Sequence, residues 1–78
     1  MDRSPDSYEK VDDKELLEQA LVLLDPELRS AFLLREVEGL QYREIADALE
    51  IPEGTVGSRL NRARRELKQH LVELGWEL

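Results

Sequence analysis

Polar side chains recur along the last third of the chain at the spacing of one helix face. Ser58, Asn61, Arg62 and Arg65 are three or four residues apart, so a helix over this segment would bring all four to one side. Arginine can pair with a phosphate or with O6 and N7 of guanine, and Asn and Ser side chains hydrogen-bond to base edges or phosphates. This pattern is typical of a helix that lies in the major groove of DNA.

Positive charge is concentrated on the same segment. The whole chain carries a net charge of −7, which argues against nucleic-acid binding over its entire surface. Residues 57–70, however, contain five Lys or Arg side chains and one Glu. A basic stripe on one helix is the electrostatic footprint of a DNA-binding domain. Because the remaining surface is acidic, we expect DNA binding by this chain alone to be weak and strongly dependent on salt.

Other kinds of site lack the residues they need. The chain has no Cys, and its lone His70, which we expect on the surface of the last helix, has no carboxylates clustered around it. The acidic residues show no spacing typical of a paired acid/base site, and Gly54 and Gly57 do not form a phosphate-binding loop. We therefore expect no enzyme activity, no metal, no cofactor and no small-molecule ligand. An Arg-rich helix can also be a merely solvated surface, but the short helix and turn that precede this one favour DNA reading.

Two helices are predicted in the first half of the chain. Apolar residues recur at spacings of three and four over residues 13–24, and Asp12 or Asp13 can cap the start of that helix. The run Asp25-Pro26-Glu27 suits the start of a second helix, which should end near Gly39 as its C′ residue.

The second half is predicted to form a helix-turn-helix. A short helix over about residues 42–49 would bury Ile45, Ala46 and Leu49, and a last helix would follow over about residues 53–74. A helix that is held by an apolar stripe must present its opposite, polar stripe outward. The apolar stripe of the last helix consists of Val56, Leu60, Ala63, Leu67 and Leu71.

These elements predict an all-α fold with one compact four-helix domain over residues 14–78, a C-terminal helix-turn-helix and no wing. Residues 1–13 are polar and charged, and we expect them to form a flexible leader or interdomain linker. The longest apolar run, residues 20–24, is too short to span a membrane, and residues 1–10 lack the apolar core of a signal peptide. A cytoplasmic protein without a membrane partner is therefore expected.

Six short runs of sequence carry a family resemblance. They are LDPELR at residues 24–29, LLREVEGL at 33–40, EIA at 44–46, IPEGTV at 51–56, SRL at 58–60 and RAR at 62–64. Together they resemble region four of bacterial RNA polymerase sigma factors, above all the extracytoplasmic-function group, over about residues 16–74. The resemblance implies a domain that recognises the −35 element of double-stranded promoter DNA and docks on the β-flap of the RNA polymerase core for transcription initiation. It also implies an anti-sigma factor as a further partner.

The resemblance assigns roles to individual residues. Ser58, Asn61 and Arg62 match base-facing positions of the family, as does Gly57 by its place in the helix. Apolar residues of the first two helices, with neighbours on the last, would form the polymerase-facing groove. The positions that match phosphate-facing residues are Arg43, Thr55, Arg59 and Arg65.

Three residues depart from the family pattern. Gly57 stands where Lys or Arg is usual, which removes a major-groove contact and costs helix propensity of up to about 1 kcal/mol. Glu50 stands where Gly is common at a helix end, and a positive φ there would add roughly 1 kcal/mol of strain. Gln41 replaces the more usual Ser or Thr cap, with a further loss on the order of 1 kcal/mol.

Two other functions compete with promoter recognition. The acidic first half could make the chain mainly a protein-interaction module for the β-flap or an anti-sigma factor, with DNA contact secondary. The helix-turn-helix could also belong to a dimeric regulator of the response-regulator type, although the Asp25-Pro26 helix start and the GTV, SRL and RAR runs fit the sigma type better. The polar leader favours a −10-recognising domain before residue 1.

Overall fold

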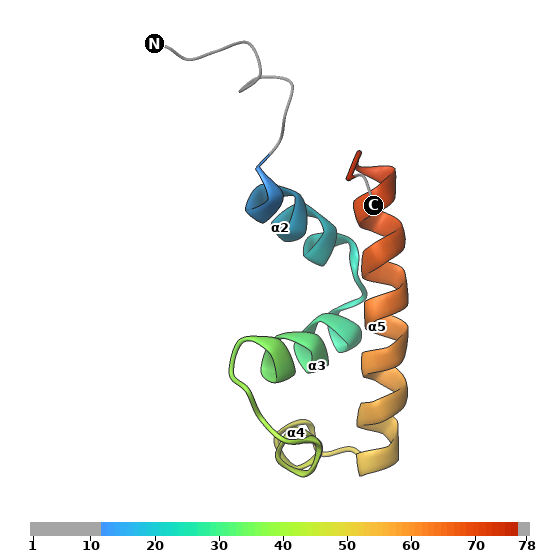
Figure 1. Ribbon diagram of the computed structural model, residues 1–78. Helices are drawn as coiled ribbons and strands as arrows, with labels where there is room; N and C mark the ends of the chain where they lie inside the picture. The colour runs from blue at the N-terminus through green and yellow to red at the C-terminus, as the bar shows by residue number, and fades with distance from the viewer. Residues whose placement is uncertain (1–11, 77–78) are drawn as a thin grey trace.

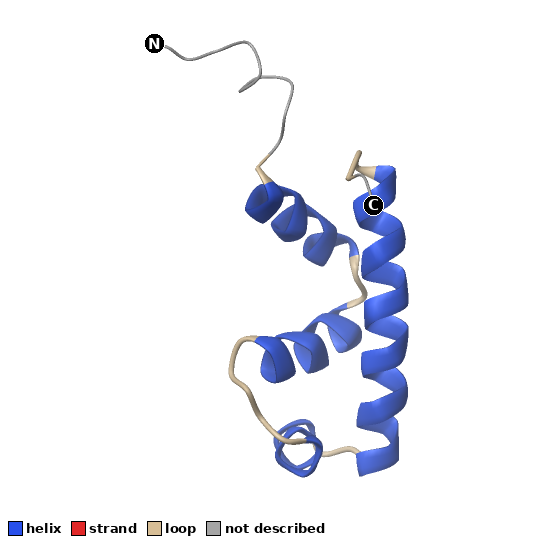
Figure 2. Cartoon of the chain, in the orientation of Figure 1, coloured by secondary structure: helices blue, strands red, loops and turns tan. Residues whose placement is uncertain are grey.

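The computed structural model describes residues 12–76 of the chain (Figure 1). Within these residues the backbone forms helices joined by loops, and it contains no strand (Figure 2). The predicted all-α fold with a C-terminal helix-turn-helix is confirmed, while most of the predicted leader, residues 1–11, lies outside the described residues. The helices are α2 (Asp13–Leu23), α3 (Pro26–Glu36), α4 (Tyr42–Leu49) and α5 (Glu53–Glu73).

Helix α5 is the long element to which the other three attach. In Figure 1, α2, α3 and α4 follow one another along its length, with α4 beside its N-terminal end and α2 towards its C-terminal end. Helices α3 and α4 also contact each other directly. None of the described helices is long and apolar enough to cross a membrane.

Two clusters of buried side chains hold the shorter helices against α5. The first joins α2 and the start of α3 to the middle of α5, and the second joins α3 and α4 to its N-terminal half. The first cluster consists of Ala20, Leu24, Leu28, Ala63 and Leu67. The second consists of Ala31, Ile45, Ala46, Val56 and Leu60.

The predicted apolar stripe of α5 is the face that these clusters bury. Val56, Leu60, Ala63 and Leu67 are all buried, and Leu71 is partly buried against the first cluster. Burial of a Val or Leu side chain contributes about 1.5–3 kcal/mol to folding, so this stripe fixes the rotation of α5 about its axis. The opposite face of the helix must therefore point to solvent.

Capping residues explain where the first two helices begin. Asp12 is the N-cap of α2, and its Oδ1 accepts the N–H of Lys14 at 3.4 Å. Asp25 occupies the N-cap position of α3 with Pro26 in the first turn, as predicted, but its side chain makes no capping hydrogen bond. The fixed φ of Pro26 and the acidic Glu27 in the first turn remain favourable at this start.

The end of α3 differs slightly from the expectation. The helix stops at Glu36 with Val37 as its C-cap, so Gly39 lies two residues beyond the cap rather than directly after it. Gly39 nevertheless has the left-handed backbone that reverses the chain, with φ at +72°. The carbonyl of Leu34 accepts the N–H of Leu40 across this bend at 3.1 Å.

Both ends of α4 are set by residues that depart from the family pattern. The N–H of Gln41, the N-cap, donates to Oε1 of Glu44 at 2.8 Å, and the two residues form a capping box in which Gln41 takes the place of Ser or Thr. Glu50 ends the helix in the left-handed region, with φ 58° and ψ 49°, which is the condition under which a glutamate adds strain at this position. The N–H of Ile51 then donates to the carbonyl of Ala46 at 3.0 Å, and the chain turns into α5.

Candidate nucleic-acid interface

The polar stripe of α5 is fully presented to solvent. Ser58, Asn61, Arg62 and Arg65 are all exposed, while Leu60 and Ala63 between them are completely buried. Helical geometry places the exposed stripe on the side of α5 that faces away from the other helices. The structure therefore brings the three residues expected to face bases onto one outward surface, together with Arg65.

Arg62 has a defined partner on this surface. Its Nε atom lies 2.8 Å from Oε2 of Glu66, one turn further along the helix, and donates a hydrogen bond to it. That hydrogen bond and the charge of Glu66 raise the pKa of the Arg62 guanidinium above its ordinary value. The side chain is 56% exposed, which leaves the end of the guanidinium open to solvent.

Ser58 is partly engaged within its own helix. Its hydroxyl donates to the carbonyl of Thr55 at 3.2 Å and lies 3.4 Å from the carbonyl of Gly54. The exposed oxygen can still accept a hydrogen bond from outside the helix. Asn61, one turn further, is exposed and can offer both a donor and an acceptor.

The residues expected to face phosphates border the stripe from two helices. Thr55 and Arg59 are one turn apart on α5 and half-buried, so they lie on one flank of the stripe. Arg43 is exposed in the first turn of α4. Thr55 is also in the first turn of α5, where the helix dipole attracts anions, although its own N–H donates to the carbonyl of Pro52 at 3.0 Å.

Arg64 lies apart from these residues. Its Nη2 atom is 3.8 Å from Oε2 of Glu36, so it faces α3 across the fold. The two side chains are 44% and 48% exposed, and an ion pair this open adds little to stability. Arg64 therefore contributes positive charge near the stripe but is not one of its members.

Sequence reasoning missed two residues that support the site. Arg35 donates through Nη1 to the carbonyl of Leu40 at 2.8 Å, and its guanidinium carbon lies 5.5 Å from the centre of the Tyr42 ring. Tyr42 in turn packs against the second core cluster at the start of α4. These contacts fix the loop that leads into the helix-turn-helix. No signal in the sequence indicated that Arg35 would contact Leu40 and Tyr42, and only the three-dimensional structure shows it.

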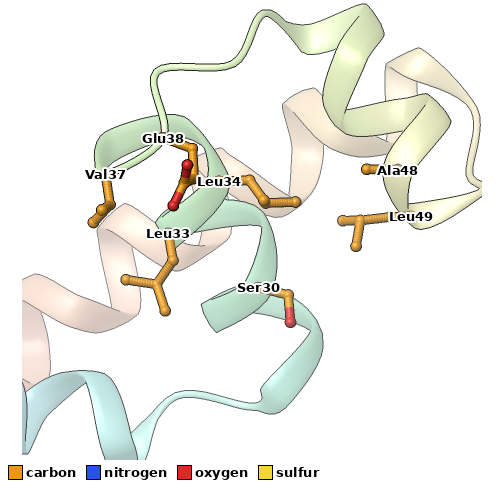
Figure 3. Close-up of a pocket in the computed structure, with 7 residues that line it drawn as sticks. All are labelled: Ser30, Leu33, Leu34, Val37, Glu38, Ala48 and Leu49. Atoms are coloured by element: carbon orange, nitrogen blue, oxygen red, sulfur yellow. The ribbon is translucent and has the colours of Figure 1, made fainter.

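An open apolar pocket lies between α3 and α4 (Figure 3). It has a volume of about 540 Å³ and takes none of its lining from α2 or α5, unlike the polymerase-facing groove that the resemblance implied. Val37 beside it is 71% exposed, which is unusual for a large aliphatic side chain in a small domain. The pocket is lined by Ser30, Leu33, Leu34, Val37, Glu38, Ala48 and Leu49.

Among residues 12–76, no group of three or more His, Cys, Asp or Glu side chains is placed to hold a metal ion. The carboxylates of α4 and α5 are instead spread over exposed helix surfaces. Within this described part of the chain, the grouping of polar and charged side chains that could bind a ligand is the exposed stripe of α5 with its flanking cations.

Comparison with known proteins identifies the family. The family model described as Sigma-70, region 4 matches residues 14–67, which is more than half of the chain and includes all seven residues singled out as DNA contacts. The match runs from the second residue of α2 to beyond the polar stripe of α5.

Curated relatives agree with this match. The chain is 44% identical over 57 residues to the ECF RNA polymerase sigma factor SigE of Mycolicibacterium smegmatis, covering 73% of this chain and 22% of the relative. It is 45% identical over 56 residues to the RNA polymerase sigma-H factor of Pseudomonas aeruginosa, covering 72% and 29%. With the ECF RNA polymerase sigma-E factor of Escherichia coli it shares 41% over 61 residues, covering 78% and 32%.

The chain thus spans only 22% to 32% of the length of these relatives. The family model, the relatives and the helix-turn-helix with its exposed polar stripe all point to the same assignment. The chain belongs to the Sigma-70 region 4 family.

Proposed function

We propose that this domain reads the −35 element of a promoter, with α5 in the major groove of duplex DNA, while RNA polymerase holds it in place for transcription initiation. The observation that carries the proposal is the exposed polar stripe of α5, which lies opposite the buried apolar stripe and directly after α4 and its turn. Helix-turn-helix proteins place a helix in this position in the major groove. The proposed role is binding, and no residue is assigned a catalytic step.

Arg62, Asn61 and Ser58 are the proposed base-facing residues. The open end of the Arg62 guanidinium suits O6 and N7 of guanine, and the Asn61 amide suits N6 and N7 of adenine. The hydroxyl of Ser58 already donates its hydrogen bond to the Thr55 carbonyl within the helix, so its oxygen would accept a hydrogen bond from an amino group of a base. Gly57, on the flank of the stripe, leaves a gap where a base-reading side chain would otherwise reach the DNA.

The proposed phosphate contacts surround this reading surface. Arg59 and Thr55 would meet the backbone of one strand beside the N-terminus of α5, where backbone N–H groups add further donors. Arg43, at the start of α4, would contact a strand that this helix crosses, and Arg65 would meet the backbone at the far end of the stripe.

The electrostatics of the chain favour assisted rather than independent binding. The chain carries −7 overall, so the acidic surface outside α5 opposes approach to DNA. Docking on polymerase would raise the effective concentration of the stripe near the promoter and compensate for weak intrinsic affinity. Because DNA and polymerase are both in the cytoplasm of bacteria, we place the protein there as well.

The pocket between α3 and α4 is the proposed docking surface for the polymerase β-flap. Its lining from Leu33, Leu34, Val37 and Leu49 can accept the apolar face of a short helix, a common mode of helix recognition. An anti-sigma factor that covered this pocket would block polymerase binding. The pocket thus supports a protein-interaction role beside DNA reading, and the match to Sigma-70, region 4 favours the sigma type over a response-regulator-type protein.

Chemical-shift mapping of the full chain tests both surfaces at once. Duplex DNA enriched from a randomised pool should shift amides of α5 around Arg62, and Arg62→Ala/Arg65→Ala should abolish those shifts. A β-flap peptide should shift amides around Val37, and Val37→Asp should remove only this second response. DNA shifts that lie outside α4 and α5, or that survive the double substitution, would contradict the proposed DNA-reading role.

A further inference from the structure

An acidic side chain lies within the basic reading surface. Glu66 is the one carboxylate among residues 57–70, and it is next to the proposed base-reading Arg62 on the helix surface. A carboxylate at this place repels DNA phosphates, so its presence needs a physical reason. A contribution to stability does not explain it, because a surface ion pair between residues four apart on a helix, such as Arg62 and Glu66, adds little to the free energy of folding.

The geometry of the pair supplies a better reason. Nε of Arg62 donates to Oε2 of Glu66 at 2.8 Å, and the Glu66 side chain is only 32% exposed. An arginine can form a bidentate pair through its two terminal nitrogens or through Nε and one terminal nitrogen. With Nε occupied by Glu66, the pair through the two terminal nitrogens is the one that remains for an outside partner.

We infer that Glu66 is a positioning residue, which holds Arg62 so that its two terminal nitrogens point outward to a base pair. This inference rests on the proposed base-reading role of Arg62. Holding the guanidinium in advance removes side-chain freedom that would otherwise be lost on binding. The negative charge of Glu66 also weakens contacts to phosphates that every DNA sequence offers. Because every sequence offers the same phosphates, this repulsion lowers binding to all DNA, and only the positioning of Arg62 raises the preference for the correct base.

Glu73 offers a matched control on the same helix. It is an exposed glutamate near the end of α5, and its Oε2 accepts from Nε2 of Gln69 at 3.5 Å across one turn. A substitution there changes the charge of α5 by the same amount, yet leaves Arg62 and its neighbours untouched. Any effect that Glu73→Gln shares with a Glu66 variant reflects charge on the helix and not the positioning of Arg62.

The test is a binding selection from a duplex pool with a randomised central segment, carried out at low salt with the full chain. Wild type, Glu66→Ala, Glu66→Gln, Glu73→Gln and Arg62→Ala are compared for base preference and for total binding to unselected DNA. Thermal unfolding followed by circular dichroism checks that each variant is folded. Glutamine keeps an oxygen that can accept from Nε but removes the charge, so it separates positioning from repulsion.

The expected results differ for the two Glu66 variants. Glu66→Ala should lower the preference for a G·C pair at the position read by Arg62 by about three- to tenfold. This is part of the discrimination against other base pairs that a bidentate contact provides. Its binding to unselected DNA should rise, because a negative charge is gone. Glu66→Gln should share that rise while keeping the base preference within about twofold of wild type. Unfolding temperatures should be nearly unchanged.

Two different failures are distinguishable. Loss of base preference in Arg62→Ala together with unchanged preference in Glu66→Ala would overturn the positioning role and leave the proposed function intact. Unchanged preference in Arg62→Ala would overturn both, because there would be no base-reading arginine to position. Equal losses in Glu66→Ala and Glu73→Gln would also overturn the positioning role, since charge alone would then explain them.

Discussion

The ring of Tyr42 lies against Gly57, with its Cε2 atom 3.7 Å from the position that a Cβ atom would take on this glycine. This distance is an ordinary van der Waals contact, so the ring borders the space of a side chain without filling it. The contact joins the start of α4 to the first turns of α5, next to the proposed reading stripe. Tyr42 is held in turn by Arg35, whose guanidinium carbon lies 5.5 Å from the ring centre.

Gly57→Ala should stabilise the domain. Gly57 is inside α5 and the added methyl group meets only Tyr42 at contact distance, so the gain in helix propensity of about 0.5–1 kcal/mol is not opposed by a clash. Urea unfolding followed by circular dichroism measures this change. Gly39→Ala is the control, and it should destabilise by about 1 kcal/mol because φ at +72° is strained for any residue with a Cβ atom. A destabilised Gly57→Ala would show that the contact with Tyr42 is tighter than the structure indicates.

Gly57→Arg should strengthen DNA binding. The new side chain would extend from the flank of the stripe and restore the cation that the family pattern has at this position, so the slope of log K against log salt should steepen by about one unit. Fluorescence anisotropy with a labelled duplex at several salt concentrations measures the slope. Gly54→Arg, one turn nearer the helix start, adds the same charge and should change the base preference less. An unaltered slope in Gly57→Arg would place this position away from the DNA.

Glu50→Gly should stabilise the turn between α4 and α5. Glu50 is the one non-glycine residue among residues 12–76 with a positive φ, and relief of that strain should gain about 0.5–1 kcal/mol after the entropy cost of glycine. Asp47→Gly is the control, because it places a glycine inside α4, and it should lower the free energy of unfolding by a similar amount. Denaturation midpoints of both variants show whether each substitution raises or lowers the stability of the domain. If both substitutions destabilise, the left-handed conformation of Glu50 carries no strain.

Arg35→Ala should weaken both folding and DNA binding. It removes the hydrogen bond to the Leu40 carbonyl and the contact with the Tyr42 ring, at a combined cost of about 1–3 kcal/mol. Arg35→Lys keeps the charge but not the planar guanidinium, so it should recover only part of the stability. Thermal unfolding and DNA titration of both variants measure the two effects. Full stability in Arg35→Lys would assign the role of Arg35 to charge alone.

Local rules were sufficient to predict the helices and the exposed polar stripe of α5. Helix α4 was expected over residues 42–49 and is found at Tyr42–Leu49, because Ile45 and Ala46 face the core and Pro52 prevents continuation. The positive φ of Glu50 could also be anticipated from the family pattern. The same periodicity that buried Leu60 and Leu67 left the polar residues of α5 outside. Each of these features depends on neighbours within a few residues in the chain.

Contacts between helices lay beyond such rules. Leu49, expected to be buried, is only half-buried beside the α3–α4 pocket. His70, expected on the surface of the last helix, is partly exposed, with 25% of its side chain open to solvent. Its Nδ1 atom is buried and lies 3.7 Å from Oε1 of Glu73. The pairing of Arg62 with Glu66 could have been found, because residues four apart on a helix are neighbours.

The central claim is that the polar stripe of α5 reads DNA, and a paired titration at low salt tests it most directly. Arg62→Ala/Arg65→Ala should bind a duplex enriched by the wild-type chain at least about tenfold more weakly, because it loses one proposed base contact and one proposed phosphate contact. The control Lys14→Ala/Arg64→Ala removes the same charge from residues that are not members of the stripe, and its loss of affinity should be clearly smaller. Equal affinity of the wild-type chain and Arg62→Ala/Arg65→Ala for that duplex would contradict the claim.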